Sequence, residues 1–481
     1  MLAAFFSQDR VRAAFRGGQL GTYLAVLAAG SGARVFGLAS QFIVLIILNR
    51  ILSKDSFGDM MIAFGFYRLI GIAFGIGASL VLIYHVSRHP NDRTAEIRLH
   101  RYSAVISAAA AALVALAGFV LAGPIAHALA KPGLEAWFRE LAPFGIFTVL
   151  LVTSTGALEG RSRITESIAL GEAAPNAVRM VLLPAVALAG LPSAYVAHAM
   201  TVSVLLPWLW SARSLCDRSV VGWRPWTSWD LSYCGKYVAA TLFANQLGAV
   251  DILVAGMLFP SEVVADYAVA ARIAALYSFF QIALLKRFAP RAAHMIQTKD
   301  VAAVRQEYVF CRKLMVGCSA LNIAGILCVG PFLLPLFGNY AGAGSFLVWL
   351  AIHAFMHSFF ATSDRLLLIA GQANVSLTTT ASTFAMLVTT PFVTAPFLGP
   401  TAIPVTMALA TALLYPLAAR VKTLFDVRTF EPRDLLLIGA GIIVLVSYAI
   451  TGAAMWGIVS VSGLSAIAFY YCRSAIRRTG A

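Results

Sequence analysis

The stretch "GSGARVFGLAS", residues 30–40, places one charged side chain, Arg34, inside an apolar run that extends over residues 22–48. The run is long enough to cross a ~30 Å hydrocarbon core as a helix. A charge at the centre of a bilayer costs roughly 2.5–3.5 kcal/mol on insertion scales, so it is kept where it faces protein, water or a ligand. What Arg34 faces therefore depends on the charges that other runs place at the same depth.

The composition indicates a membrane protein built from helices. Of 481 residues, 60% are hydrophobic and 12% are charged, with a mean hydropathy of +0.82, whereas soluble domains carry about 25% charged residues. Apolar runs recur along the whole chain. We predict an all-α, polytopic protein with fourteen spans near residues 22–48, 58–85, 103–130, 138–158, 166–190, 193–215, 233–258, 264–288, 306–332, 343–364, 373–398, 400–420, 434–451 and 453–472.

The net charge of +15 is explained by orientation in the membrane and predicts no nucleic-acid partner. If both termini are cytoplasmic, the cytoplasmic segments hold 28 Lys and Arg residues and the outside loops hold four. Such an excess is how helices are oriented. Residues 1–21 place their charges after a short apolar piece, which favours an interfacial segment over a signal peptide.

Four of the 36 basic residues remain, and all of them are arginines inside predicted spans: Arg34, Arg68, Arg179 and Arg272. Counted from the outer end of each span, they lie about 12–21 Å deep at a ~1.5 Å rise per residue. The alternative is that each pairs separately with a local carboxylate or carbonyl. Few acids share the membrane interior, so we expect one cationic cavity.

The acids that do share the interior are Glu172 and Asp251. Glu172, Asn176 and Arg179 follow at i, i+4 and i+7, which makes a polar stripe on one helix face, and Pro175 within it predicts a kink. Asp251 lies near the depth of the arginines. A carboxylate beside arginines titrates low, which favours a counter-ion, although a proton-coupling role stays open.

The tenth span carries a histidine pair. His353 and His357 are separated by four residues, a spacing that zinc sites also use. With no Glu in the motif, and with six cysteines that form no CxxC pair, we expect neither a metal nor a disulfide framework. Two interpretations of the histidines remain: packing and hydrogen bonding, or proton handling.

The chain also contains a candidate internal repeat, since "DSFGDM" (residues 55–60) and "EVVADY" (residues 262–267) open the second and eighth spans. Arg68 follows Asp59 by nine residues, and Arg272 follows Asp266 by six. An offset of six spans preserves orientation, which predicts two parallel halves with the site between them. The expected organisation is an interfacial segment, a six-helix bundle, a linker, a second six-helix bundle and two extra helices, at 1–21, 22–215, 216–232, 233–420 and 421–481.

The chain resembles a known family. "VFGLASQFIVLIILNRILSKDSFGDMMIAFGFYRLI" and "DILVAGMLFPSEVVADYAVAARIAALYSFFQIAL" are similar to the starts of the two halves in the polysaccharide-flippase branch of the multidrug/oligosaccharidyl-lipid/polysaccharide (MOP) superfamily, which includes the Wzx O-antigen flippases. The resemblance implies a flippase that moves a polyprenyl-pyrophosphate-linked oligosaccharide across the bacterial inner membrane by alternating access around a cationic cavity. Lipid II flippases place arginines in their first, second and eighth spans, as here with Arg34, Arg68 and Arg272; Arg179 falls outside that pattern.

The resemblance implies membrane lipid and other polysaccharide-assembly proteins as partners, no cofactor, and H⁺ or Na⁺ as candidate coupling ions. A multidrug exporter of the same fold is an alternative, but buried arginines repel organic cations. A lipid II flippase is another, although the first-span arginine is not followed by an acid here. A polysaccharide polymerase or ligase, an enzyme, is disfavoured because the outside loops are short.

Overall fold

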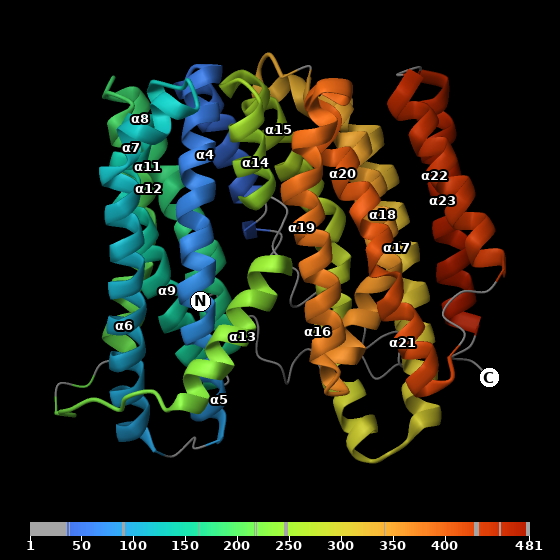
Figure 1. The fold of residues 1–481 in the computed structure, drawn as a ribbon, viewed down its shortest axis with the longest axis horizontal. Helices are drawn as coiled ribbons and strands as arrows, with labels where there is room; N and C mark the ends of the chain where they lie inside the picture. Colours follow the sequence, from blue (N-terminus) through green and yellow to red (C-terminus); the bar gives the residue numbers. More distant parts are fainter. Residues whose placement is uncertain are drawn as a thin grey trace. The chain divides into compact units, whose positions relative to one another are not determined.

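Figure 1 shows the chain as a computed structural model. It describes residues 36–477 apart from gaps at 38, 89–91, 162, 216, 218, 245–248, 341, 428–431 and 452–453. Every secondary-structure element in these residues is a helix, which confirms the predicted all-α class. Lipid offers the backbone no hydrogen-bond partner, so a chain this apolar satisfies its N–H and C=O groups within helices.

Some of the helices are long and apolar enough to cross a membrane. Within the described residues, six stretches meet this condition by length and composition: Lys54–Val86, Arg93–Val120, Gly133–Gly160, Val301–Gly330, Ala343–Ile369 and Asn374–Phe425. Shorter or interrupted helices coincide with other predicted spans. The protein is thus a multi-pass membrane protein. The count of fourteen spans stays a prediction, and most of the first span lies outside the described residues.

The chain forms two compact units, and the described residues divide between them after Ala268. The N-terminal unit begins with a helix at Ala39–Ile51. It continues with α4 (Lys54–Ile70), the π-helix η1 (Gly71–Ile76), α5 (Gly77–Arg88), α6 (Arg93–Val120), α7 (Ala122–Ala128), α8 (Gly133–Glu140), α9 (Ala142–Gly160), α10 (Ile164–Ile168), the π-helix η2 (Ala169–Ala173), α11 (Ala174–Leu188), α12 (Ala194–Leu215), α13 (Ser228–Ala244) and α14 (Asp251–Leu258). Helix α15 (Ser261–Ala274) crosses the division.

The C-terminal unit is built around α17, which packs along α23. The two helices approach closely at Gly317, where an added Cβ would lie 2.7 Å from Cys472 Sγ. The elements of this unit after α15 are η4 (Ala275–Ser278), α16 (Phe279–Gln297), α17 (Val301–Phe337), α18 (Ala343–Ile369), α19 (Ala373–Leu398), η5 (Gly399–Thr401), α20 (Ala402–Ala410), η6 (Thr411–Leu414), α21 (Tyr415–Phe425), α22 (Pro432–Thr451) and α23 (Ala454–Arg477).

The compact units and the bundles expected from the sequence are defined differently, and the predicted bundles stay a prediction. The division groups α13 and α14 with the helices before them, whereas the sequence predicts bundles at 22–215 and 233–420. The compact units are defined by contacts between residues, whereas the predicted bundles are defined by a repeat in the sequence. The repeat itself therefore stays a prediction.

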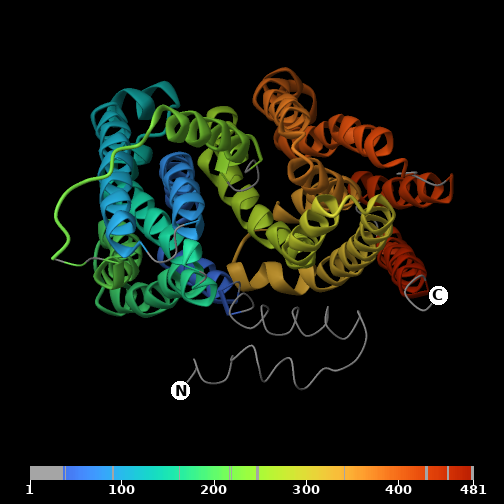
Figure 2. The same cartoon turned by 90° about the horizontal axis from the view of Figure 1, so that it is seen from below.

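The second predicted span is the centre of the N-terminal unit. The path α4–η1–α5 contacts α6, α9 and α13 and is seen end-on in Figure 2. Small residues bring it close to α9: a Cβ on Gly71 would lie 2.6 Å from Thr148 Cγ2, and one on Gly156 would lie 2.0 Å from Ser79 Oγ. Larger side chains would separate these backbones. This packing fixes the helix that carries Arg68.

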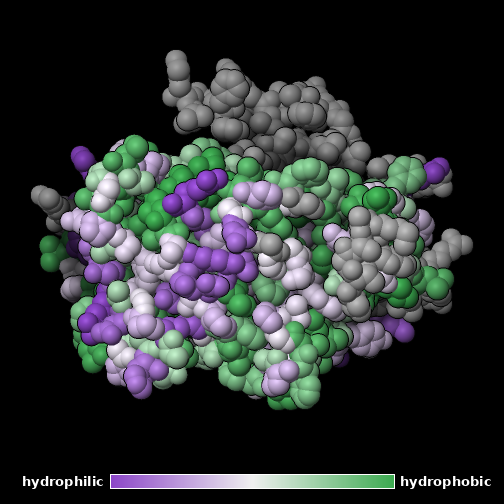
Figure 3. Space-filling view, turned by 90° about the horizontal axis from the view of Figure 1, so that it is seen from above, coloured by the Kyte–Doolittle hydropathy of each residue, from purple (hydrophilic) through white to green (hydrophobic). Residues whose placement is uncertain are grey.

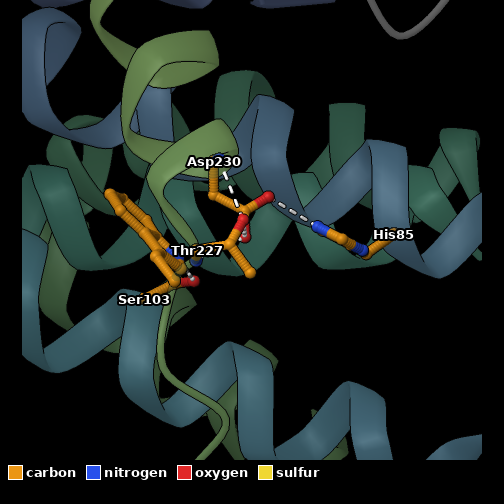
Figure 4. Close-up of polar contacts among 5 residues, drawn as sticks. His85, Ser103, Thr227 and Asp230 are labelled. Carbon is orange, nitrogen blue, oxygen red and sulfur yellow. Dashed lines mark hydrogen bonds and ion pairs between the residues drawn. The ribbon is translucent and has the colours of Figure 1, made fainter.

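Helix α13 is fastened at its start, as Figure 4 shows. Asp230 Oδ2 accepts a hydrogen bond from Thr227 N at 2.9 Å, and Thr227 Oγ1 accepts from Asp230 N at 3.2 Å, a reciprocal capping box. The other Asp230 oxygen lies 2.6 Å from His85 Nε2 on α5. Trp226 Nε1 donates to Ser103 Oγ on α6 at 2.8 Å. The predicted linker is thus tied to the N-terminal unit.

Candidate functional site

Arg68 and Asp251 form the first part of the site. Arg68 occupies the last turn of α4 and is half-buried. Asp251 opens α14 with a side chain that is 0% exposed, and its charge acts on Arg68. Tyr267 on α15 donates from Oη to Asp251 Oδ2 at 2.8 Å. A buried carboxylate is retained at this depth only when it is paired and hydrogen-bonded, and Asp251 meets both conditions.

Arg179 on α11 is the second arginine of the site. Its Nε donates to Ser203 Oγ on α12 at 2.9 Å, and its Nη1 donates to Asn176 Oδ1 at 3.2 Å. The guanidinium carbon lies 5.8 Å from the centre of the Phe144 ring on α9. The positive charge of Arg68 acts on Arg179. Two like charges held together in a helix bundle destabilise each other until an anion is added.

The polar stripe of the fifth span leads from Arg179 towards Glu172. Asn176 Nδ2 donates to the backbone oxygen of Glu172 at 3.0 Å and to that of Gly37 at 3.4 Å. Glu172 itself is exposed. The stripe thus contacts the first helix through a backbone carbonyl. Arg34, three residues before Gly37 in the sequence, lies outside the described residues.

A π-helical backbone occurs at or near three of the charged positions, Arg68, Glu172 and Asp251. Helix η1 follows Arg68, η2 contains Glu172, and residues 249–250 are π-helical immediately before Asp251. In η2 the N–H of Ala174 donates to Ala169 O, five residues back. The π turn stands where the sequence predicts a kink at Pro175. Such turns are frequent at functional sites, and the sequence pattern does not predict them.

The remaining predicted residues lie in the C-terminal unit. Arg272 occupies the last turn of α15 and is half-buried. On α18, His353 Nδ1 lies 2.7 Å from Thr411 Oγ1 and 3.0 Å from Met407 O. The ring centre of His357 is 5.9 Å from that of His353, and the charge of Asp364 acts on His357. His353 thus has hydrogen-bond partners, and a role in proton handling stays a prediction.

The structure thus gathers Arg68, Arg179 and Asp251 in one unit. Two further residues of this cluster, Tyr267 and Ser203, were not predicted. Tyr267 is the last residue of the quoted "EVVADY", but nothing in the local spacing predicts its contact with Asp251. Ser203 is one of several serines in an apolar span, and nothing in its spacing distinguishes it from the others. Both take part through contacts between helices, which sequence spacing does not encode.

Comparison with known proteins agrees with this architecture. Residues 47–309 match the polysaccharide biosynthesis protein family. A search of curated proteins found no match. Among solved structures, the fold is similar to the lipid II flippase MurJ in an inward closed conformation, at 12% identity over 93% of this chain and 98% of that one, with a TM-score of 0.72.

Two other solved structures share the fold. One is an inward-facing multidrug resistance MATE family transporter of the MOP superfamily, at 16% identity over 82% of this chain and 96% of that one, with a TM-score of 0.68. The other is a MOP superfamily transporter from Pyrococcus furiosus, at 14% identity over 84% and 96%, with a TM-score of 0.64. The chain therefore belongs to the polysaccharide biosynthesis protein family and has the fold of the MOP-superfamily exporters.

Proposed function

We propose that the protein is a flippase of the bacterial inner membrane, with both termini in the cytoplasm. Its substrate is a polyprenyl-pyrophosphate-linked oligosaccharide, such as the repeat unit of an O-antigen or another polysaccharide. The observation that carries the proposal is an electrostatic cluster in the N-terminal unit, in which the charge of Arg68 acts on Arg179 and the charge of the fully buried Asp251 acts on Arg68. The family and the fold of transporters support it.

The chemistry of the cluster suits a pyrophosphate. A pyrophosphate does not cross hydrocarbon without compensation for its lost hydration. Guanidinium groups supply charge-assisted, bidentate hydrogen bonds to phosphate oxygens. In this proposal Arg34 and Arg272 complete the cationic cavity, the prenyl tail stays in lipid, and alternating access exposes the cavity to each side in turn.

The acids and histidines have supporting roles in the proposal. Asp251 is the counter-ion that holds Arg68 when the cavity is empty, and Glu172 is a second candidate counter-ion. The histidines, His353 and His357, are candidates for proton handling if H⁺ rather than Na⁺ is the coupling ion. Membrane lipid surrounds the protein, and other polysaccharide-assembly proteins are its expected partners.

The test is binding of undecaprenyl pyrophosphate to the purified protein in nanodiscs. Replacing one arginine, in Arg68→Ala or Arg179→Ala, removes a charge-assisted contact of roughly 1.5–3 kcal/mol. The expected loss of affinity is about tenfold to a hundredfold. The matched control is Arg139→Ala, because Arg139 is exposed on α8 and paired with Glu135 at 2.7 Å. Wild-type affinity in both cluster variants would contradict the proposal.

The same preparation distinguishes a multidrug exporter. Tetraphenylphosphonium, an organic cation, should bind weakly to the wild type because the arginines repel it. If Arg68→Ala left pyrophosphate binding unchanged and the wild type bound the cation tightly, a multidrug exporter would replace the flippase.

Sidedness needs its own measurement. Single cysteines replacing Asn339 or Lys299 in a cysteine-free background are treated with an impermeant maleimide on intact spheroplasts. The proposed topology predicts labelling at position 339 and none at position 299. The reverse pattern would refute it.

A further inference from the structure

A second site lies at the end of the N-terminal unit that carries α8. A hollow of about 820 Å³ opens there, lined by residues from four connections between helices. We call it the α8 hollow. Its lining residues fall within the segments 53–59, 129–140, 193–194 and 257–261, although not every residue of these segments lines it. These are the four segments of this unit that the sequence predicts to face outside.

Buried hydrogen bonds hold the walls of the α8 hollow in place. Lys131 Nζ, which is nearly buried, donates to the backbone oxygens of Gly256 at 2.7 Å and Phe259 at 2.6 Å. Asp59 accepts a hydrogen bond from the Ser261 hydroxyl. These contacts join the connection after α7 and the start of α4 to the connection between α14 and α15. The hollow is therefore a built cavity between fixed segments.

Its lining combines polar groups with apolar surface. The carboxylates are those of Asp55, Asp59 and Glu140, against the single ammonium of Lys131. Hydroxyls come from Ser53, Ser56, Ser193 and Ser261. Apolar surface comes from Trp137, Met257, Leu258, Phe259, Pro132 and Pro260. Figure 3, seen from this end, shows hydrophilic side chains gathered over the N-terminal unit.

This combination suits a sugar and not a phosphate. Sugar hydroxyls donate strong hydrogen bonds to carboxylates and exchange bonds with serine hydroxyls, while the C–H faces of the ring pack on apolar surface. The excess of carboxylates repels an anion. The volume lies in the range of about 300–1,000 Å³ that is usual for small-ligand pockets. An acidic, hydroxyl-lined hollow therefore selects neutral or amino sugars.

We infer that the α8 hollow binds the glycan of the transported lipid-linked oligosaccharide on the outer side of the membrane. The inference rests on the proposed function. Asp55, exposed, and Glu140, half-buried, accept hydrogen bonds from the sugar hydroxyls. The pyrophosphate and the glycan are thus held by two separate sites of opposite charge.

The test uses the native chain and two soluble probes. The first probe is free oligosaccharide released by mild acid from the lipid-linked pool of the producing bacterium. The second is inorganic pyrophosphate. The double variant Asp55→Asn/Glu140→Gln should weaken oligosaccharide binding by about tenfold or more, because two charge-assisted bonds become neutral. It should leave pyrophosphate binding unchanged.

The matched control is Glu135→Gln. Glu135 lies on α8 like Glu140 and also has a partner, Arg139, as Glu140 has His198 at 3.5 Å, but Glu135 does not line the hollow. A second readout places Ser193→Cys in a cysteine-free chain, where an impermeant maleimide should label it on spheroplasts and the oligosaccharide should slow the labelling. Equal oligosaccharide binding by the wild type and the double variant would overturn the inference, as would no labelling on spheroplasts.

The two proposals fail separately. Suppose that the oligosaccharide binds the wild type and not the double variant, while the affinity for pyrophosphate is the same in the wild type and in Arg68→Ala. The glycan site is then supported and the proposed pyrophosphate site is refuted. If pyrophosphate binding depends on Arg68 and the oligosaccharide binds all variants alike, the reverse holds.

Discussion

Two regions of the N-terminal unit differ in their charge and in the structural elements that carry their side chains. In the arginine cluster, two guanidiniums and one carboxylate, which is 0% exposed, act on one another through their charges. In the α8 hollow, three carboxylates line an open cavity with one lysine. The cluster is carried by helix interiors with π turns, and the hollow by the connections between helices. One unit thus carries a cationic cluster and an acidic hollow in different parts, and we propose that the first binds phosphate and the second binds sugar.

We expect the largest effect from removing the carboxylate of Asp251, whose negative charge balances the arginine cluster. Asp251→Ala leaves the Arg68 charge and the Tyr267 hydroxyl without their buried partner, and breaking a buried pair costs about 3–5 kcal/mol. We expect a large fall in thermal unfolding temperature in detergent. Asp251→Asn keeps a hydrogen-bond acceptor for Tyr267, so it should fold and instead impair resetting between transport cycles. Unchanged transport by Asp251→Asn at several pH values would exclude both the counter-ion and the proton-coupling role.

The next effect tests whether the cluster needs guanidinium geometry. Arg68→Lys keeps the charge and loses the bidentate fork. Its affinity for undecaprenyl pyrophosphate should lie between that of the wild type and that of Arg68→Ala, which is weaker by about tenfold to a hundredfold. Separate structural ion pairs would instead lower expression or thermal stability and leave binding intact. Titration of the three proteins side by side decides between these outcomes.

A smaller effect concerns the walls of the hollow. Lys131→Met leaves the oxygens of Gly256 and Phe259 without their donor, at a cost of about 1–3 kcal/mol for each buried unsatisfied group. Lys54→Met is the matched control, because the Lys54–Asp266 pair at 2.9 Å is partly exposed and such pairs contribute about 0–1 kcal/mol. Denaturant unfolding should show the larger loss for Lys131→Met. Equal losses would mean that Lys131 does not hold the hollow.

The smallest effect is local and depends on pH. Burial raises the pKa of Asp230, but hydrogen bonds from His85 and Thr227 outweigh it, so the pKa lies below its ordinary value. A carboxyl with a lowered folded-state pKa stabilises the fold above its unfolded pKa of about 3.9 and loses this contribution as the pH falls through the folded value. The protection of the amides in the first turn of α13, measured by hydrogen exchange relative to the intrinsic rate at each pH, should therefore fall below about pH 4. Exchange equal to that of Asp230→Asn throughout would contradict this.

Sequence patterns predict the helices better than the contacts. Hydropathy locates the spans because lipid forces the backbone into helices, and depth counting places Arg68, Arg179 and Asp251 in one layer. The partners Tyr267 and Ser203 come from other helices, so no local spacing reveals them. The α8 hollow is formed by four connections that are distant in sequence. For such segments, hydropathy predicts only that they are loops.

The most direct test of the central claim is transport by the purified protein in liposomes. Polyprenyl-pyrophosphate-linked oligosaccharide from the producing bacterium is placed in the membrane, and the fraction of glycan open to periodate added outside is followed over time. The account predicts that the wild type and Arg139→Ala equilibrate the glycan between leaflets and that Arg68→Ala/Arg179→Ala does not. Equilibration by the double variant at the wild-type rate would contradict a pyrophosphate site at these arginines.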